Sequence, residues 1–253
     1  RRVVRQLSAV VVEEPGILVL EGARAAALWT TPDEGRCVGV LCEDGRAISA
    51  RTTILATGGA AALWSRTTNP PGSLGIGLML AHAAGAALAD LEFVQFHPTA
   101  IIGVPGREGF LVTEAIRGEG ALLLDAAGER FVEELAPRDE VARAIFNTIR
   151  SHSTTHVDLD MRHIDPALFP NVVTALREHG LDPVTQLLPV APACHYFMGG
   201  IVADLDGATT VPGLYAIGES ACTGLHGANR LASNSLSECF VMGRRAGLAG
   251  LDE

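Results

Sequence analysis

The sequence predicts an α/β protein in which two β-rich segments enclose a middle segment of helices and polar loops. Short β-rich runs occur before residue 57, helical patterns dominate the middle, and strand character returns near Val211. A Pro/Gly-rich break at residues 69–72 marks the passage into the middle segment. The chain has 253 residues, 48% of them hydrophobic, which suffices for one large domain or two interlocked ones.

Short strands are predicted across residues 8–56. Ile17–Leu20, Cys37–Cys42 and Thr53–Ala56 are β-rich runs, and Pro, Gly and Asp residues separate them. The last run leads into a loop where the backbone can approach a ligand closely, because glycine lacks a Cβ atom. This loop consists of Ala56, Thr57, Gly58 and Gly59.

The middle of the chain predicts amphipathic helices. Pro137 suits a first helical turn, and Val141, Ile145 and Ile149 follow at the i, i+4, i+8 spacing of one apolar face. A second helix is expected over residues 165–180, which start with Asp-Pro and end with Gly.

The end of the chain predicts a strand, a polar loop and a helix. Strand character runs from Val211 to Ile217, and the final helix is expected from about Ser233 to Leu248. The stretch Gly224–Leu236 contains a His, an Arg, two Asn and two Ser among glycines. Polar donors beside a core are costly unless a polar group fills the space, and a helix N-terminus attracts an anion or an electron-rich ring. We therefore expect a ligand site in this stretch.

Composition and charge exclude several classes of protein. The formal net charge of −10 argues against nucleic acid or an anionic membrane as the main partner. Five cysteines without a Cys-x-x-Cys pair indicate a reducing compartment. Residues 74–89 imitate a membrane span, but their small residues favour a tightly packed internal helix. Because the first residues show no signal-peptide pattern, we expect a cytoplasmic protein that does not enter a membrane.

Two further patterns are set aside. The cluster of His152, His156, Asp158, Asp160 and His163 resembles a metal site, but its sequence does not predict the helix that His-x-x-x-His binding needs, so no metal is expected. No convincing Gly-x-Gly-x-x-Gly turn, the usual cradle of a dinucleotide pyrophosphate, follows a predicted strand.

Four motifs accompany the polar loop. They contain His97 after an apolar run, Thr113 and Glu114 before Arg117, Arg138 after Leu-Ala-Pro, and His195 after Ala-Cys. Together they supply histidines and arginines, and arginine grips a carboxylate with two parallel hydrogen bonds without losing its charge. This set of side chains suits a dicarboxylate ligand.

In this order, the motifs resemble the flavoprotein family of succinate dehydrogenase, fumarate reductase and L-aspartate oxidase. Three segments favour the aspartate-oxidising branch of that family. They are Leu-Ala-Pro-Arg-Asp at 135–139, Tyr-Ala-Ile-Gly-Glu at 215–219 followed by Thr-Gly-Leu-His at 223–226, and Asn-Arg-Leu-Ala-Ser-Asn-Ser-Leu-Ser-Glu-Cys at 229–239. The succinate and fumarate enzymes typically have Gly where Ala232 stands.

The resemblance implies a role for each motif. Non-covalent FAD would contact Ala56, Thr57, Gly58, Gly59, Glu219, Asn234, Ser235 and Leu236. The substrate carboxylates would be held by His97, Thr113, His195 and Arg230. Proton transfer would involve Arg138 with Glu114 and Arg117.

The resemblance also implies an activity and an architecture. The activity is oxidation of L-aspartate, or another C4 dicarboxylate, to iminoaspartate with oxygen or fumarate as acceptor, the first step of quinolinate and NAD biosynthesis. Its product would pass to quinolinate synthase. A partial Rossmann-like FAD-binding domain, residues 1–70 and 188–253, would be interrupted by a fumarate-reductase-type capping domain, residues 71–187.

On this resemblance, the chain is expected to be an internal fragment that lacks the N-terminal glycine motif and the C-terminal helical domain. Two alternatives stay open: the chain is a succinate dehydrogenase or fumarate reductase flavoprotein, or it is an inactive truncated chain that retains no FAD alone.

Overall fold

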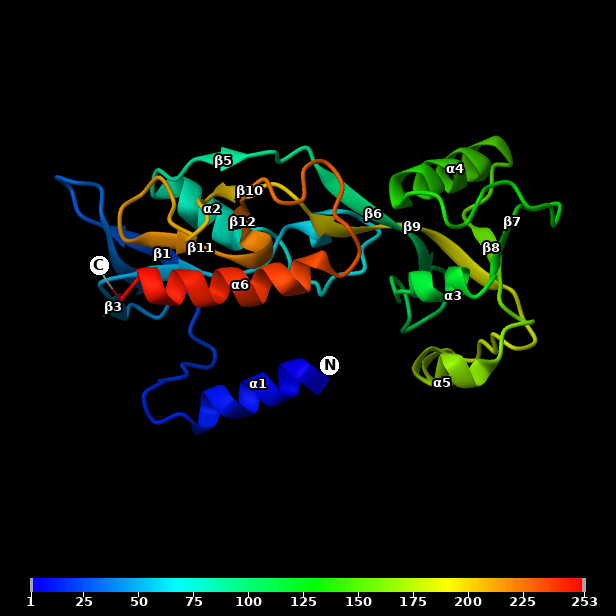
Figure 1. Ribbon diagram of the computed structural model, residues 1–253, viewed down its shortest axis with the longest axis horizontal. Coiled ribbons are helices and arrows are strands. Elements are labelled where there is room, and N and C mark those ends of the chain that lie inside the picture. The colour runs from blue at the N-terminus through cyan, green and yellow to red at the C-terminus, as the bar shows by residue number, and fades with distance from the viewer. Residues whose placement is uncertain (1, 252–253) are drawn as a thin grey trace.

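The computed structural model describes residues 2–251, which form a larger and a smaller part (Figure 1). The larger part holds both ends of the chain, and the smaller part is made from the middle of the sequence. In chain order, the elements up to the crossing are α1 (Arg2–Glu13), β1 (Ala25–Thr30), β2 (Cys37–Cys42), β3 (Ala47–Ser49), β4 (Thr53–Leu55), the 3-10 helix η1 (Ala61–Leu63), α2 (Ile76–Ala83), β5 (Leu88–Ala89) and β6 (Val94–Ile101).

The remaining elements build the smaller part and then return to the larger one. They are α3 (Glu114–Gly118), β7 (Leu122–Leu124), α4 (Arg138–Ser151), β8 (Val157–Asp160), η2 (Pro166–Leu168), α5 (Pro170–Arg177), β9 (Leu188–Phe197), β10 (Gly200–Val202), β11 (Leu214–Ala216), η3 (Gly218–Ser220), β12 (Ala221–Cys222) and α6 (Asn234–Ala249).

Three small sheets form the larger part. An antiparallel sheet has the order β1-β2-β3, a parallel pair joins β4 to β11, and a mixed sheet has the order β12-β10-β5. Because β4 and β11 are parallel, the chain segments that follow them leave the pair at the same edge. Leu55, Ile201 and Leu214 lie in the hydrophobic core of this part.

A four-stranded antiparallel sheet of order β6-β9-β8-β7 forms the smaller part, together with α3, α4 and α5. Its core contains Ile116, Leu159 and Leu188, all fully buried. The face of α4 predicted from the sequence is confirmed: Val141 and Ile145 are fully buried, because residues four apart share one side of a helix.

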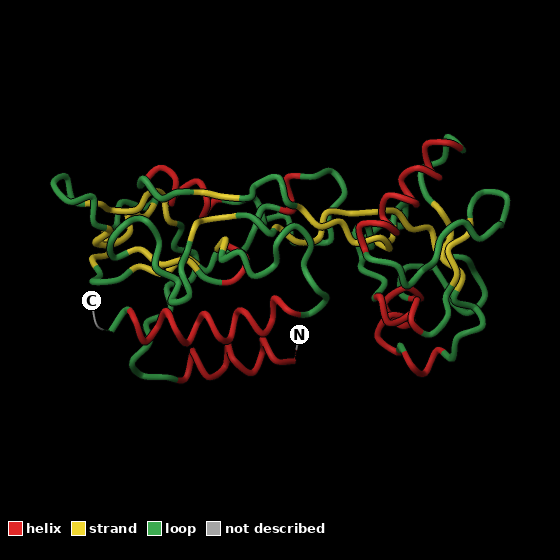
Figure 2. The backbone as a smooth tube through the Cα atoms, turned by 45° about the horizontal axis from the view of Figure 1, so that its top comes forward, coloured by secondary structure: helices red, strands yellow, loops and turns green. Residues whose placement is uncertain are grey.

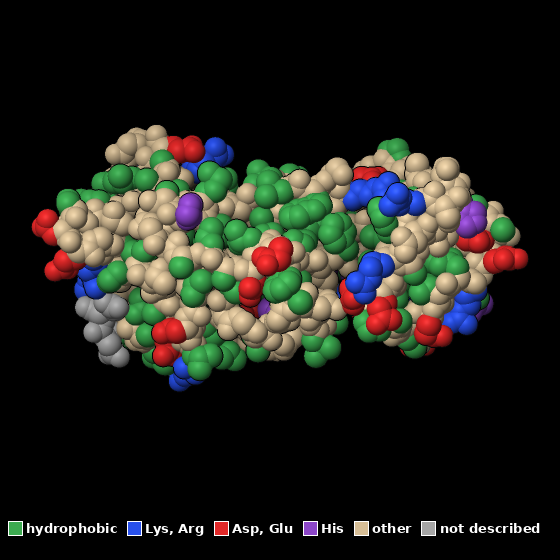
Figure 3. Space-filling model, turned by 90° about the horizontal axis from the view of Figure 1, so that it is seen from above, with side chains coloured by type: hydrophobic (Ala, Val, Ile, Leu, Met, Phe, Trp, Pro, Cys, Tyr) green, Lys and Arg blue, Asp and Glu red, His purple; other side chains and the backbone are tan. Residues whose placement is uncertain are grey.

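The long strands β6 and β9 run from one part to the other (Figure 1). They pair from Val94 opposite Phe197 to Ile101 opposite Val190. Figure 3 shows a notch in the surface between the two parts, with basic side chains beside it on the smaller part. The paired strands therefore bring residues of the larger and the smaller part together where the two parts meet.

The prediction of strands at the beginning of the chain was wrong. Residues 2–13 form α1, and Ile17–Leu20 has no strand. The β-branched run Val10–Val12 favours a strand, but Val3, Leu7 and Val11 follow the helical i, i+4, i+8 spacing. α1 lies outside both cores, on the same side of the molecule as α6 (Figures 1 and 2).

Most of the other predicted elements are confirmed. Strands occur at Cys37–Cys42 and Thr53–Leu55, and a helix occupies Asn234–Ala249. The expected helix over residues 165–180 is split into η2 and α5. Pro170 explains the break, since its ring favours a first helical turn rather than the interior of a helix.

The apolar residues 74–89 form α2 and β5 rather than one long helix. No helix within residues 2–251 is long and apolar enough to cross a membrane. Leu78, Ala81 and Leu88 pack in the core of the larger part. The domain limits at residues 71 and 188 stay predictions, and these contacts favour a first boundary closer to Val94.

Candidate functional site

A polar cavity of about 420 Å³ lies where the two parts meet. Of the seven residues predicted for substrate binding and proton transfer, only Arg117 does not line it. The lining residues from that prediction are His97, Thr113, Glu114, Arg138, His195 and Arg230. The structure therefore brings together side chains that are up to 133 positions apart in the sequence.

Each of these side chains is placed by a secondary-structure element. His97 lies on β6 and His195 on the paired strand β9, so their rings meet edge to face at 5.2 Å between centroids. Thr113 directly precedes α3, and Arg138 is the first residue of α4. Arg230 comes from the loop before α6.

Burial keeps both histidines neutral. The pKa of His195 is lowered to about 4, mainly by burial and also by Arg230 and Arg138, while the pKa of His97 is lowered well below its ordinary value for the same main reason. His97 Nδ1 accepts a hydrogen bond from the Thr99 amide at 3.2 Å, which leaves the proton of the neutral ring on Nε2. His97 Nε2 is buried without a partner among the described residues, so it is free to donate to a ligand.

Three charged residues form a connected line at the cavity wall. Arg138 Nε donates to Glu114 Oε2 at 2.6 Å, and the same oxygen lies 3.9 Å from Arg117 Nη2. Arg117 is buried, its Nη1 donates to the carbonyl of Glu134, and burial lowers its pKa. Glu114 thus connects an arginine in the cavity with an arginine behind it.

Arg230 is a buried guanidinium in the cavity, 6% exposed. It lies over the ring of Tyr196 at 4.4 Å, and its Nη1 is 3.4 Å from Ser235 Oγ. Burial, with the nearby charge of Arg138, lowers its pKa. Its Nε has no partner among residues 2–251, which leaves a charged donor available for an anion.

Gln95 is a site residue that the sequence reasoning missed. Its amide nitrogen donates to Asn229 Oδ1 and to the carbonyl of Arg230, both at 2.7 Å, and its oxygen accepts from Arg138 Nη1 at 3.1 Å. Gln95 is only 3% exposed. The available signal was a polar residue between Val94 and Phe96 in an apolar strand.

A second missed residue is Glu238, a buried carboxylate on α6. It accepts from His226 Nε2 at 2.8 Å, from Thr223 Oγ1 at 3.1 Å and from Tyr196 Oη at 3.4 Å. Since Arg230 lies over Tyr196, these bonds fix the ring under the guanidinium. His226 thus has an internal partner, which partly explains the polar composition of the loop.

Three of the eight residues predicted to contact a flavin line the same cavity. Glu219, Ser235 and Leu236 line it, and Asn234 starts α6. The Ala56–Gly59 loop is adjacent: Thr57 N donates to Ser220 Oγ at 3.0 Å, and a Cβ on Gly59 would lie 2.6 Å from Glu219 Oε1. Ala56, Thr57 and Leu236 are exposed. A helix N-terminus, a carboxylate and exposed apolar surface together fit a ribityl-flavin.

The cavity is lined by basic and acidic side chains, with the carboxylates of Glu114 and Glu219 beside the arginines. Two guanidinium groups and two neutral histidines face a space large enough for a small ligand. Within the described residues, no group of three or more His, Cys, Asp or Glu is arranged to hold a metal ion.

Comparison with known proteins identifies the family of the chain. The sequence model of the FAD binding domain family matches residues 2–236. The L-aspartate oxidase of Nostoc sp. is 48% identical over 96% of the chain and 45% of the relative, and that of Streptomyces coelicolor is 50% identical over 91% and 43%. The chain spans less than half the length of these relatives.

Solved structures show the same relationship. E. coli quinol fumarate reductase superposes with a TM-score of 0.89 at 33% identity, covering 98% of the chain and 47% of that protein. Mycobacterium smegmatis Sdh1 superposes with a TM-score of 0.80 at 34% identity, covering 99% and 45%. The resemblance read from the motifs is confirmed: the chain belongs to the FAD-binding domain family, among the flavoproteins that include L-aspartate oxidase and fumarate reductase.

Proposed function

We propose that the chain carries the substrate site of an FAD-dependent oxidase that converts L-aspartate to iminoaspartate, with oxygen or fumarate as acceptor. The observation that carries this proposal is the polar cavity, where two arginines and two neutral histidines converge. Relatives about half identical to the chain are L-aspartate oxidases, which supports aspartate as the dicarboxylate.

The substrate would be held at both of its carboxylates. Arg230 supplies charge for one carboxylate, and neutral His97 offers its free Nε2–H as a donor. His195 and Thr113 line the same cavity and supply further polar contacts. Holding both ends fixes the Cα–H of the substrate in one direction, so catalysis depends largely on positioning.

The cofactor, when bound, supplies the hydride acceptor. Its site in this chain would be formed by the Ala56–Gly59 loop, Glu219, and the start of α6 with Asn234, Ser235 and Leu236. Glu219 would accept hydrogen bonds from hydroxyl groups of the cofactor, and the N-terminus of α6 would stabilise negative charge on its ring system.

Arg138 would contact the substrate and exchange protons through Glu114 and Arg117. A guanidinium is a poor base, since its pKa in proteins is above about 12. The 2.6 Å bond to Glu114 supports a relay that shares a proton along the line. In amine oxidation, Arg138 also orients the substrate and stabilises developing charge.

A second candidate is a succinate dehydrogenase or fumarate reductase flavoprotein. It is favoured by the TM-score of 0.89 against E. coli quinol fumarate reductase. The closer sequence identity to L-aspartate oxidases, and Ala232 in place of the glycine typical of the other branch, favour aspartate. Turnover of succinate without turnover of aspartate would select the second candidate.

The proposed reaction is the first step of quinolinate and NAD biosynthesis. Iminoaspartate is a reactive imine, so hand-over to quinolinate synthase in the cytoplasm would limit its hydrolysis. Coelution of the two proteins tests this part of the proposal.

The deciding experiment is a visible absorption spectrum of the purified chain with FAD, before and after anaerobic addition of L-aspartate. Retained flavin that bleaches with aspartate, but not with succinate, supports the oxidase. A chain that retains no flavin refutes the proposal for this chain in isolation, and retained flavin that bleaches only with succinate refutes aspartate as the substrate.

A further inference from the structure

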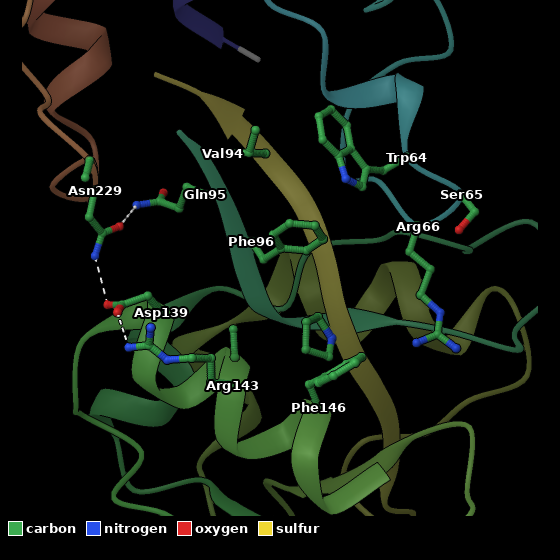
Figure 4. Close-up of a pocket in the computed structure, with 13 residues that line it drawn as sticks. Trp64, Ser65, Arg66, Val94, Gln95, Phe96, Asp139, Arg143, Phe146 and Asn229 are labelled. Atoms are coloured by element: carbon green, nitrogen blue, oxygen red, sulfur yellow. Dashed lines mark hydrogen bonds and ion pairs between the residues drawn. The ribbon is translucent and has the colours of Figure 1, made fainter. Parts of the chain in front are cut away.

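A second cavity, of about 520 Å³, lies between the two parts (Figure 4). Its lining residues differ from those of the polar cavity. We call it the hinge cavity. Its larger-part wall includes Trp64 and Arg66, and its smaller-part wall includes Ala142 and Phe146 of α4. Its size is within the range of about 300–1,000 Å³ typical of small-molecule sites.

The two cavities lie back to back. Three neighbouring pairs along the chain each place one residue in each cavity: Phe96 and His97, Asp139 and Arg138, Asn229 and Arg230. On β6 the alternation of a strand explains this division, because successive side chains point to opposite faces. The hinge cavity is therefore the reverse side of the polar cavity, and it contains none of the residues assigned to substrate or cofactor.

Three aromatic side chains line the hinge cavity. Trp64 and Phe96 meet edge to face, with 6.4 Å between ring centroids and 88° between ring planes. Phe146 lies on α4 across from them (Figure 4) and is 52% exposed. Edge-to-face aromatic groups around a space offer favourable contacts to a planar ring.

The two arginines of the hinge cavity differ in whether a carboxylate neutralises them. Arg143 is paired with Asp139 at 2.6 Å, and Asp139 also accepts from Asn229 at 3.0 Å, so this side of the cavity is balanced (Figure 4). Arg66, on the other side, has no carboxylate within ion-pair distance among residues 2–251, and it makes one 3.3 Å bond to the carbonyl of Thr155. One uncompensated guanidinium beside aromatic rings complements a planar aromatic anion.

We propose that the hinge cavity is a second ligand site, which binds a planar aromatic compound carrying one carboxylate or sulfonate group. The ring lies between Trp64, Phe96 and Phe146, and the anionic group pairs with Arg66. A ligand here also contacts Gln95, whose amide holds Arg138 and the backbone of Arg230 on the other face. The site is thus placed to respond to, or influence, the arrangement of the two parts.

The test uses 8-anilinonaphthalene-1-sulfonate as the probe and its uncharged analogue N-phenyl-1-naphthylamine as the control for charge. The chain has two tryptophans, and Trp29 lies on β1, away from the cavity. In the Trp29→Phe background, Trp64 is the only tryptophan, so quenching of its emission reports on the hinge cavity. Neither probe needs FAD or substrate, so the result does not depend on the proposed function.

We expect saturable quenching of Trp64 by the sulfonate. Arg66→Gln should weaken binding of the sulfonate about tenfold and leave binding of the uncharged analogue unchanged, since only the anion pairs with the guanidinium. Ala142→Phe, which fills the cavity, should remove binding of both probes, whereas Ala144→Phe on the same helix, outside the cavity, should not. Phe146→Ala, at a position that is 52% exposed, should also weaken binding of both probes.

Two results would overturn the proposal. One is unchanged sulfonate binding in Ala142→Phe or Phe146→Ala, which would place the probe elsewhere. The other is equal affinity for the charged and uncharged probes in the parent chain, with no effect of Arg66→Gln. That result would mean an apolar surface without anion selectivity.

Discussion

Glu219 is a carboxyl group whose burial makes the stability of the fold depend on pH. Burial raises its pKa to about 7, and Glu238 adds to the rise, while the hydrogen bond from the Phe197 amide at 3.0 Å and the charge of Arg230 oppose it. Between about pH 4.5 and 7 the folded carboxyl keeps a proton that the unfolded chain releases. The contribution of Glu219 to stability therefore falls as the pH rises through this window.

The size of this effect follows from the shift. One pKa unit corresponds to about 1.4 kcal/mol, so ionised Glu219 lowers the free energy of unfolding by about 3 kcal/mol well above pH 7. At pH 5 most of that penalty is absent. The substitution Glu219→Gln removes the titration and keeps an oxygen that can accept from the Phe197 amide. The free energy of unfolding of the variant, relative to that of the parent, should therefore increase by about 2.5 kcal/mol from pH 5 to pH 8.

The assay is urea unfolding of the chain without FAD, followed by circular dichroism at both pH values. Glu21→Gln makes the same chemical change at an exposed position and serves as the control. If the free energies of unfolding of the parent and of Glu219→Gln differ by the same amount at pH 5 and pH 8, the reasoning is refuted. Glu219 would then titrate as a solvated carboxyl.

Three further predictions test other parts of the molecule. Arg230→Ala should weaken L-aspartate binding to the flavin-loaded protein at least about 100-fold and leave FAD affinity nearly intact; loss of flavin in a spectral titration would contradict the placement of Arg230. Because neutral His195, with its pKa lowered to about 4, must gain a proton on acid unfolding, stability should fall as the pH falls from 6.5 towards 4. His195→Asn should remove about 2.5 kcal/mol of that loss between pH 7.5 and 4.5, and equal acid sensitivity of both chains would argue against the shift. Ile145→Ala, in the fully buried face of α4, should cost about 3 kcal/mol in urea unfolding, whereas Ala at the partly buried Ile149 should cost less.

The sequence determined the residues of the polar cavity more completely than it determined the fold of the first segment. Arginine, histidine and the glycine-flanked loop at 224–236 carry a chemical requirement that a core does not have, so they stand out without a structure. The faces of α4 and the final helix also follow from the sequence, because helical periodicity is a property of neighbouring residues. At the N-terminus two local signals conflict: β-branched residues favour a strand, and their spacing favours the helix that forms.

Only the tertiary structure decided which polar groups satisfy one another. Gln95 is a single polar residue between Val94 and Phe96, Glu238 follows a polar stretch, and nothing nearby in the sequence indicates the partners of either. Their hydrogen bonds reach Asn229, 134 positions from Gln95, and Tyr196, 42 positions from Glu238. The same holds for the hinge cavity, whose walls come from the segment that follows η1, from β6 and from α4. Local periodicity specifies which side of a helix or strand is buried. The pairing of β6 with β9 determines which residues contact that side, because this pairing brings residues that are distant in the sequence within hydrogen-bond distance.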